Sequence, residues 1–275
     1  MIRYIKLVLM ELHRFWKIYA ALAAITVISQ TAGLWMSIRS HIKRVHWEME
    51  LTSIGTYAEF AKTYGRTSFR SIVSFNELFF MGPVMICIAV LLIYVFLIWY
   101  RDWYGKNAFV YRLLMLPASR FRLFWAKLTA IMLFVLGLVA LQIVLLPLLM
   151  AMYRQMMPAE LSLAESVFSY VRHHIVFQIL LPPHAADFFL YYGLGFVAVT
   201  VVFAAILMER AWRLKGLIAG ILYVSAATLV MTFPLSLDYV LYPHEIWGLM
   251  GGIGLVLFLA SVWISRTLLA KKITV

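Results

Sequence analysis

The chain has 275 residues, of which 64% are hydrophobic and only 13% are charged, and its mean hydropathy is +0.91. Soluble domains usually have about a quarter of their residues charged, so this composition excludes the soluble classes and indicates an integral membrane protein. The net charge of +12 does not indicate nucleic-acid binding, because an excess of Lys and Arg is the usual topology determinant of membrane proteins and also contacts anionic lipid.

Residues 1–17 are predicted to form an amphipathic helix on the membrane surface. Apolar residues recur there at steps of three and four, and basic residues occupy much of the remaining circumference. Such a helix would be an interfacial elbow. The pattern fits either a plain anchor or an elbow that also contacts a partner.

Six segments lack Asp, Glu, Lys and Arg and reach the roughly 20 residues that a helix needs to cross about 30 Å of hydrocarbon. Because lipid offers the backbone no other hydrogen-bond partner, these segments should be helices. We expect an all-α membrane protein that forms a single transmembrane domain over residues 1–275. The predicted transmembrane helices are 18–38, 78–100, 128–153, 188–208, 216–237 and 246–265.

The loops between these spans differ in length and pattern. Residues 39–77 hold six basic and four acidic residues, with scattered Gly, Thr and Ser, which suggests short exposed helices. Residues 159–181 lie between Pro158 and Pro182 and are predicted to form one amphipathic helix on the membrane surface.

The basic residues assign an orientation. With both termini in the cytoplasm, the inner segments hold 16 basic residues and three acidic ones, Glu11, Asp102 and Glu209, whereas the outer segments hold 8 basic and 9 acidic residues. Basic residues are retained on the cytoplasmic side of short loops. We therefore expect a bacterial-type plasma membrane protein with cytoplasmic N- and C-termini.

The inner loop between the second and third spans has a distinctive pattern. Asp102 and Gly105 precede the run from Tyr111 to Arg120, YRLLMLPASR, and Lys127 opens the third span. This pattern resembles the ABC-2 type transporter permeases, in which an acidic residue and a glycine precede a Leu-rich helix, a Leu-Pro-x-Ser-Arg turn and a lysine. The family usually has Glu where this chain has Asp102.

The resemblance implies a cytoplasmic coupling helix at 109–116 that sits in a groove of a partner ATPase. Apolar side chains of such a helix would fill the groove, and arginines would pair with acidic residues on its rim. A following Pro would end the helix and a Ser could cap the next one. The expected ATPase-coupling residues are Asp102, Gly105, Phe109, Arg112, Leu113, Leu116, Pro117, Ser119 and Arg120.

A permease of this kind needs other chains. The sequence has no G-x-x-x-x-G-K-[ST] motif, so we expect no cofactor and no ATP hydrolysis on this chain, with ATP and Mg on ABC ATPase subunits. The other expected partners are a second permease, identical or related, and membrane lipid. The resemblance implies ATP-driven transport, which we expect to be export. Uncharged spans favour a hydrophobic or amphipathic substrate such as a peptide, an antibiotic or a lipid. Gln142, Thr200 and Thr228 could line its path or serve only in helix packing.

Two other functions remain open. One is a non-transporting immunity or sensor subunit that keeps the ATPase contact. The other is a membrane metallohydrolase that uses histidines and carboxylates on the predicted outer face, although their spacing fits no ligand signature. These residues are His173, His174, His184, Asp187, His244 and Glu245.

Overall fold

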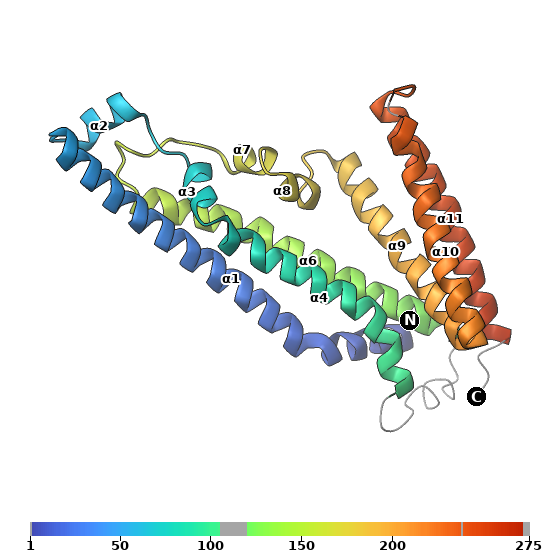
Figure 1. Ribbon diagram of the computed structural model, residues 1–275. Coiled ribbons are helices and arrows are strands. Elements are labelled where there is room, and N and C mark those ends of the chain that lie inside the picture. The colour runs from blue at the N-terminus through green and yellow to red at the C-terminus, as the bar shows by residue number, and fades with distance from the viewer. Residues whose placement is uncertain (1, 105–119, 238, 272–275) are drawn as a thin grey trace. The chain divides into compact units, whose positions relative to one another are not determined.

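Long helices dominate the structure, a computed structural model that describes residues 2–104, 120–237 and 239–271 (Figure 1). These residues form no β-strand, and their one isolated β-bridge joins Thr67 and Ser162. Six of the described helices are long and apolar enough to cross a membrane. The predictions of an all-α fold, six apolar spans and an integral membrane protein are therefore confirmed.

Each predicted span falls in one of these long helices, except that 216–237 covers α10 and the short 3-10 helix η1 that follows it. In chain order the helices are α1 (Ile2–Thr52), α2 (Tyr57–Tyr64), α3 (Phe69–Phe75), α4 (Glu77–Tyr104), α6 (Arg120–Met156), α7 (Val167–Arg172), α8 (Ile175–Leu180), α9 (Ala185–Trp212), α10 (Leu214–Thr232), η1 (Phe233–Leu237) and α11 (Pro243–Lys271).

Helix α1 is much longer than its apolar run. It has 51 residues, about 75 Å at 1.5 Å per residue, against about 30 Å of hydrocarbon. The expectation that residues 39–52 form a loop with short helices is wrong, because charges keep a segment out of lipid without preventing it from being helical. No helix boundary occurs near residue 17, and the surface location of residues 1–17 stays a prediction.

The chain divides into two compact units. Unit 1 contains Met1–Arg14, Leu91–Leu133 and His184–Val275, and unit 2 contains Phe15–Val90 and Phe134–Pro183. Helices α1, α4 and α6 each contribute one part to unit 1 and another part to unit 2. Each unit therefore has to be described with its own portion of these three helices.

Unit 2 surrounds an apolar core contributed by α1, α4, α6 and the short helices. At its centre Phe69 makes edge-on contacts with Tyr153 and Tyr170, with ring centroids 5.7 and 5.2 Å apart. Such aromatic pairs stabilise beyond the area that they bury. Close approach of helices completes the unit, because a Cβ on Gly33 of α1 would lie 2.5 Å from the Phe79 Cβ of α4.

The single amphipathic helix predicted over 159–181 is also wrong. Two six-residue helices, α7 and α8, form instead, and residues before them are tied to another segment. The Thr67 N–H donates to the Leu161 carbonyl at 2.8 Å, and the Leu163 N–H donates to the Thr67 carbonyl at 2.9 Å. These backbone bonds replace helix bonds, and Ser166 then caps α7 by accepting from the Ser169 N–H.

Unit 1 contains α9, α10 and α11, which lie side by side (Figure 1). Helices α9 and α10 meet at a tight turn, where Arg213 adopts a φ of 53°. A Cβ on Gly216 would lie 2.0 Å from the Met208 carbonyl oxygen, so only glycine allows this approach. A hydrogen bond of 2.7 Å between the Tyr223 and Ser261 hydroxyls joins α10 to α11.

Candidate functional site

The three acidic residues on the predicted cytoplasmic side all have side-chain partners on other helices. Glu11 of α1 and Asp102 of α4 bind basic residues, and Glu209 of α9 accepts a hydrogen bond from the Tyr100 hydroxyl. All of these residues belong to unit 1. The few acidic residues on the predicted cytoplasmic side, where basic residues predominate, therefore each make a contact between helices.

Lys127 of α6 lies at the centre of these contacts and has no exposed surface. Its ammonium donates to Glu11 Oε1 at 2.9 Å, to Asp102 Oδ2 at 2.5 Å and to the Ile98 carbonyl at 2.7 Å. An ammonium has three N–H donors, so this lysine is fully satisfied without water.

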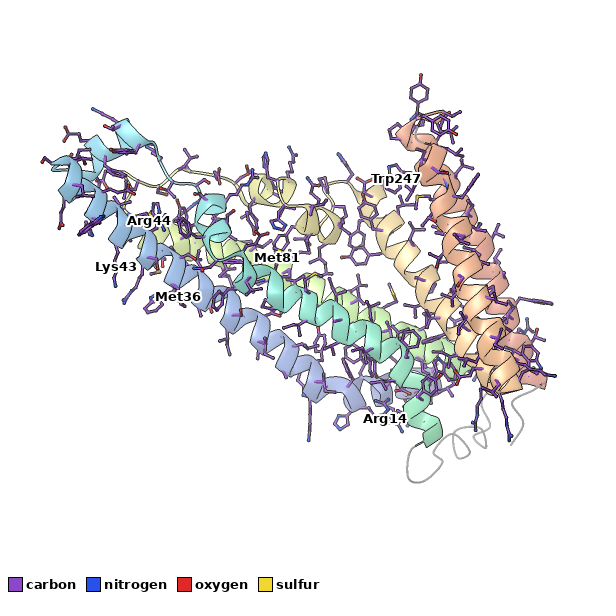
Figure 2. The ribbon with its side chains drawn as sticks, viewed as in Figure 1. Arg14, Met36, Lys43, Arg44, Met81 and Trp247 are labelled. Atoms are coloured by element: carbon purple, nitrogen blue, oxygen red, sulfur yellow. The ribbon has the colours of Figure 1, made fainter. Side chains whose placement is uncertain are left out.

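Two arginines complete the arrangement. Arg101 donates to Glu11 Oε2 at 2.6 Å, and Arg14, labelled in Figure 2, donates to Asp102 Oδ1 at 2.8 Å. All four carboxylate oxygens therefore accept a bond from a cation. Together these residues form the charged cluster, which consists of Glu11, Arg14, Arg101, Asp102 and Lys127.

Three helices bring the charged cluster together. Glu11 and Arg14 are separated by three residues and share one face of α1, whereas Arg101 and Asp102 are adjacent near the end of α4. Lys127 comes from the second turn of α6. The cluster thereby links α1, α4 and α6 inside unit 1.

Aromatic side chains surround the central lysine. The Lys127 Nζ lies 5.3 Å from the centre of the Trp99 ring, within the range of a cation–π contact. The ring of Phe203 on α9 makes edge-on contacts with Trp99 and with Phe124 at 5.5 and 5.6 Å. An apolar surrounding strengthens ion pairs and makes an unpaired charge costly.

This arrangement ties helix ends together through charged side chains. Every carboxylate oxygen of Glu11 and Asp102 is bonded to a cation, so neither carboxylate is available as a general base. The cluster is close in sequence to the inner loop, since Asp102 precedes Gly105 by three residues and Lys127 follows Ser119 by eight. It holds together the helix ends from which that loop departs.

Asp102 is the one predicted coupling residue whose side chain the structure describes, and it is buried in the charged cluster. Arg120 begins α6. The remaining predicted coupling residues lie outside the described residues, and with them the predicted coupling helix at 109–116. They are Gly105, Phe109, Arg112, Leu113, Leu116, Pro117 and Ser119.

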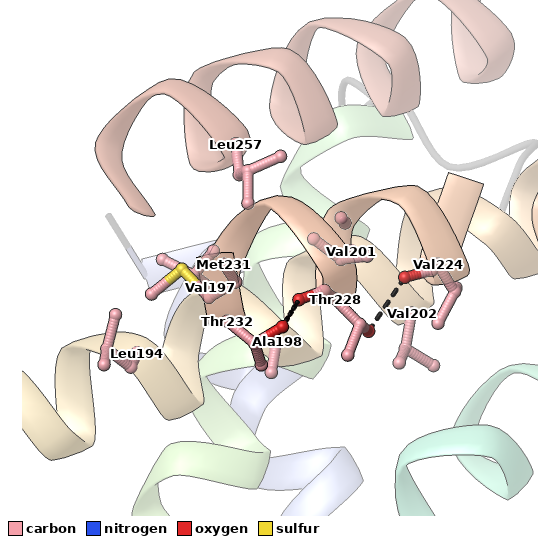
Figure 3. Close-up of a pocket in the computed structure, with 11 residues that line it drawn as sticks. Leu194, Val197, Ala198, Val201, Val202, Val224, Thr228, Met231, Thr232 and Leu257 are labelled. Atoms are coloured by element: carbon pink, nitrogen blue, oxygen red, sulfur yellow. Dashed lines mark hydrogen bonds between the residues drawn. The ribbon is translucent and has the colours of Figure 1, made fainter. Parts of the chain in front are cut away.

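Of the three residues proposed for a substrate path, Thr228 lines a cavity of about 320 Å³ in unit 1 (Figure 3). The walls come from α9, α10 and α11 and are mostly Val, Leu, Ala and Met. Thr228 donates to the Val224 carbonyl at 2.9 Å, so its hydroxyl adds no free donor to the cavity.

The other two path residues are buried outside this cavity. Thr200 donates to the Val197 carbonyl of its own helix at 2.7 Å. Gln142 belongs to unit 2, and its Oε1 accepts no hydrogen bond from any residue that the structure describes. Gln142 thus belongs to a different unit from Thr200 and Thr228, and Thr228 lies on the wall of the cavity described above.

The histidines of the predicted outer face are divided between the two units, with His173 and His174 in unit 2 and His184 and His244 in unit 1. Throughout the described ranges, no three His, Cys, Asp or Glu side chains form a group that could hold a metal ion. His174 binds Glu77 at 3.1 Å, and the His173 ring lies 2.7 Å from the Ser169 carbonyl. The metallohydrolase alternative therefore has no arrangement of ligands to support it among these residues.

Comparisons of the chain with protein-family models, with curated proteins and with solved structures found no match.

Proposed function

We propose that the chain is the transmembrane permease subunit of an ATP-driven ABC transporter and exports a hydrophobic or amphipathic substrate. It would pair with a second permease, identical or related, and with two ATPase subunits that hold ATP and Mg. Closure of the ATPases would move the inner loop and alternate the access of a path between the permeases.

The observation that carries this proposal is the position of the charged cluster at both ends of the inner loop. Force applied to a loop reaches a helix only if the ends of the loop are firmly anchored. Asp102 anchors the end of α4, Lys127 anchors the start of α6, and Glu11 ties both to α1. A movement of the loop would therefore displace three helices together.

The cavity between α9, α10 and α11 supports the substrate class. Its lining is apolar apart from Thr228 and Thr232, and both hydroxyls donate within their own helix, as the dashed lines in Figure 3 mark. Apolar pockets with few polar groups favour apolar ligands. A peptide, an antibiotic or a lipid fits this description better than a small ion.

Co-expression with candidate ATPase subunits of the same genome tests the proposal. A stable complex is expected after purification, and Leu113→Asp should remove the ATPase, because an aspartate cannot fill an apolar groove. Arg122→Gln is the matched control, because Arg122 is exposed on α6 and is not part of the predicted coupling set. If no ATPase co-purifies, or if Leu113→Asp binds it as well as Arg122→Gln does, the proposal is wrong.

Transport in vesicles then separates a transporter from an immunity or sensor subunit. ATP-dependent movement of a labelled amphipathic peptide or lipid supports export. A complex that hydrolyses ATP but moves none of a panel of such substrates would support the non-transporting function instead.

A further inference from the structure

A second cavity with charged walls lies in unit 2, around the C-terminal part of α1. Its volume is about 540 Å³, within the usual range of small-ligand sites. It is bounded by α1 from His41 to Glu48, by α2 and α3, and by the segment that contains Leu163 and Glu165. It is called the α1–α3 pocket below.

Hydrogen bonds to Thr67 fix the walls of this pocket. The Thr67 hydroxyl is bonded to His41 Nε2 on α1 at 2.9 Å. Its carbonyl accepts from the Tyr153 hydroxyl at 2.6 Å and from the Leu163 N–H at 2.9 Å. Thr67 thereby ties the wall formed by α1 to the wall formed by the Leu163 segment and joins both to α6, which is more order than a gap between mobile loops would have.

Two basic and two acidic residues line the pocket, Arg44, Arg66, Glu48 and Glu165. Within the described residues none of the four takes part in an ion pair. The guanidinium of Arg44, which Figure 2 labels, lies over the Phe75 ring at 4.0 Å, so its direction is fixed by an uncharged group.

Glu165 supplies the strongest indication of a ligand. Its Oε2 has almost no exposed surface and accepts no hydrogen bond from the described residues. A buried carboxylate oxygen without a donor is costly. Rotation of this carboxylate would turn the oxygen towards the pocket, where a bound group that carries N–H donors, such as an ammonium, would satisfy it.

The pocket lies close to where the membrane surface should be. The apolar run of α1 ends at Ile38, and Arg44 follows about 9 Å further along the helix, near the roughly 5–8 Å headgroup layer. Trp35 and Trp47 are exposed on either side of it along α1. Exposed Trp marks the headgroup level of membrane proteins, and long arginine side chains reach towards it.

We propose that the α1–α3 pocket binds a phosphoethanolamine group, the headgroup of a zwitterionic membrane lipid. Arg44 and Arg66 would bind the phosphate, and Glu165 and Glu48 would bind the ammonium. The formal charges of these four side chains cancel, so the pocket favours a ligand that carries both signs over a simple anion or cation. The proposal does not depend on an ATPase partner or on transport.

Native mass spectrometry of the purified full-length chain tests this proposal with three lipid probes. Phosphatidylethanolamine should be retained as a single adduct about tenfold more tightly than phosphatidylglycerol, which lacks the ammonium, or phosphatidylcholine, whose quaternary ammonium has no N–H to donate. Arg66→Gln and Glu165→Gln should each reduce this retention about tenfold, because each removes charge-assisted bonds.

Matched controls keep the outcome interpretable. Arg70→Gln and Glu59→Gln remove the same charges from exposed positions of α3 and α2 outside the pocket, and they should leave retention unchanged. Thermal melting of all four variants shows whether any loss arises from unfolding. A variant that melts early is replaced by Arg66→Lys or Glu165→Asp, which keep the charge and should retain part of the preference.

Soluble glycerophosphoethanolamine distinguishes the source of the group. If it competes with the lipid at micromolar concentration, the pocket serves a soluble ligand of the same chemistry rather than a lipid. Equal retention of the three lipids, or retention unaffected by Arg66→Gln and Glu165→Gln in folded protein, would overturn the proposal.

Discussion

Arginine and carboxylate side chains are arranged differently in the charged cluster of unit 1 and in the α1–α3 pocket of unit 2. In the charged cluster two carboxylates and three cations bond to one another. Glu11, Asp102 and Lys127 are buried there, whereas Arg14 and Arg101 keep part of their surface exposed. In the pocket two carboxylates and two arginines border a cavity of about 540 Å³ and form no ion pair with any described residue.

The side chains of the charged cluster hold helices together, whereas those of the α1–α3 pocket are arranged to bind a ligand. A buried network in which every hydrogen-bond donor and acceptor has a partner makes the helices rigid relative to one another. Removing one member leaves an unpaired charge in an apolar environment. Charged side chains that border a cavity without forming ion pairs contribute little to the stability of the fold, but they can bind a ligand. Removal of a charge should therefore affect stability in one region and binding in the other.

The largest expected effect is that of Lys127→Met. The change keeps the side-chain volume but leaves Glu11 and Asp102 buried with one hydrogen-bonded cation each, so unfolding in mixed detergent should become easier by about 3–5 kcal/mol. Arg122→Gln on the same helix should change it by no more than about 0.5 kcal/mol. Equal effects of the two variants would show that Lys127 is not buried in an ion network.

Changes to Asp102 sharpen this result. Lengthening it to Glu, the residue usual in the ABC-2 permeases, should cost about 1–3 kcal/mol of unfolding free energy, because an extra methylene must fit a closed site. Asp102→Asn keeps the size and removes the charge, which should cost more because Lys127 and Arg14 lose a counter-ion. A neutral Asp102→Glu variant would show that the charged cluster is loosely packed.

A moderate effect is expected at the wall of the pocket. Thr67→Val removes the hydroxyl that bonds His41, and the loss of one such bond should cost about 1 kcal/mol in the same unfolding measurement. Thr63→Val is the control, because the Thr63 hydroxyl donates to the Glu59 carbonyl of its own helix. If both variants unfold alike, Thr67 does not hold the pocket together.

The smallest effect on stability should come from Arg66→Gln. Because Arg66 is exposed and forms no ion pair with a described residue, its loss should change unfolding by no more than about 0.5 kcal/mol. Lipid retention should nevertheless fall. A loss of stability comparable with that of Lys127→Met would contradict the distinction between the two regions.

Hydropathy predicted the six spans because lipid requires each of them to be a helix of about 20 apolar, uncharged residues. It did not predict that α1 continues to Thr52, since the end of an apolar run marks the edge of the membrane and not the end of the helix. The run 159–181 was wrongly predicted as one helix because the hydrogen bonds that Thr67 makes to Leu161 and Leu163 come from a distant segment.

The charged cluster escaped the sequence prediction for the same reason. Lys127 and Glu11 are 116 residues apart. In the sequence Glu11 appears only as a contributor to the inner charge balance, and Lys127 only as the lysine of the inner-loop pattern. One sequence feature could have found them: Glu11, Asp102 and Glu209 are the rare acidic residues among many basic ones. Asp102 itself was named as a coupling residue, but its burial and its three-helix contacts were not foreseen.

A double-mutant cycle tests the central claim most directly, that the charged cluster is one interdependent unit joining α1, α4 and α6. The free energy of unfolding is measured for the wild type, Lys127→Met, Asp102→Asn and the double variant. The double variant should be less destabilised than the sum of the single ones, with a coupling of about 1–3 kcal/mol. Arg66→Gln and Glu165→Gln in the pocket should add within about 0.5 kcal/mol. Additivity of Lys127 and Asp102 within the same margin would contradict the claim.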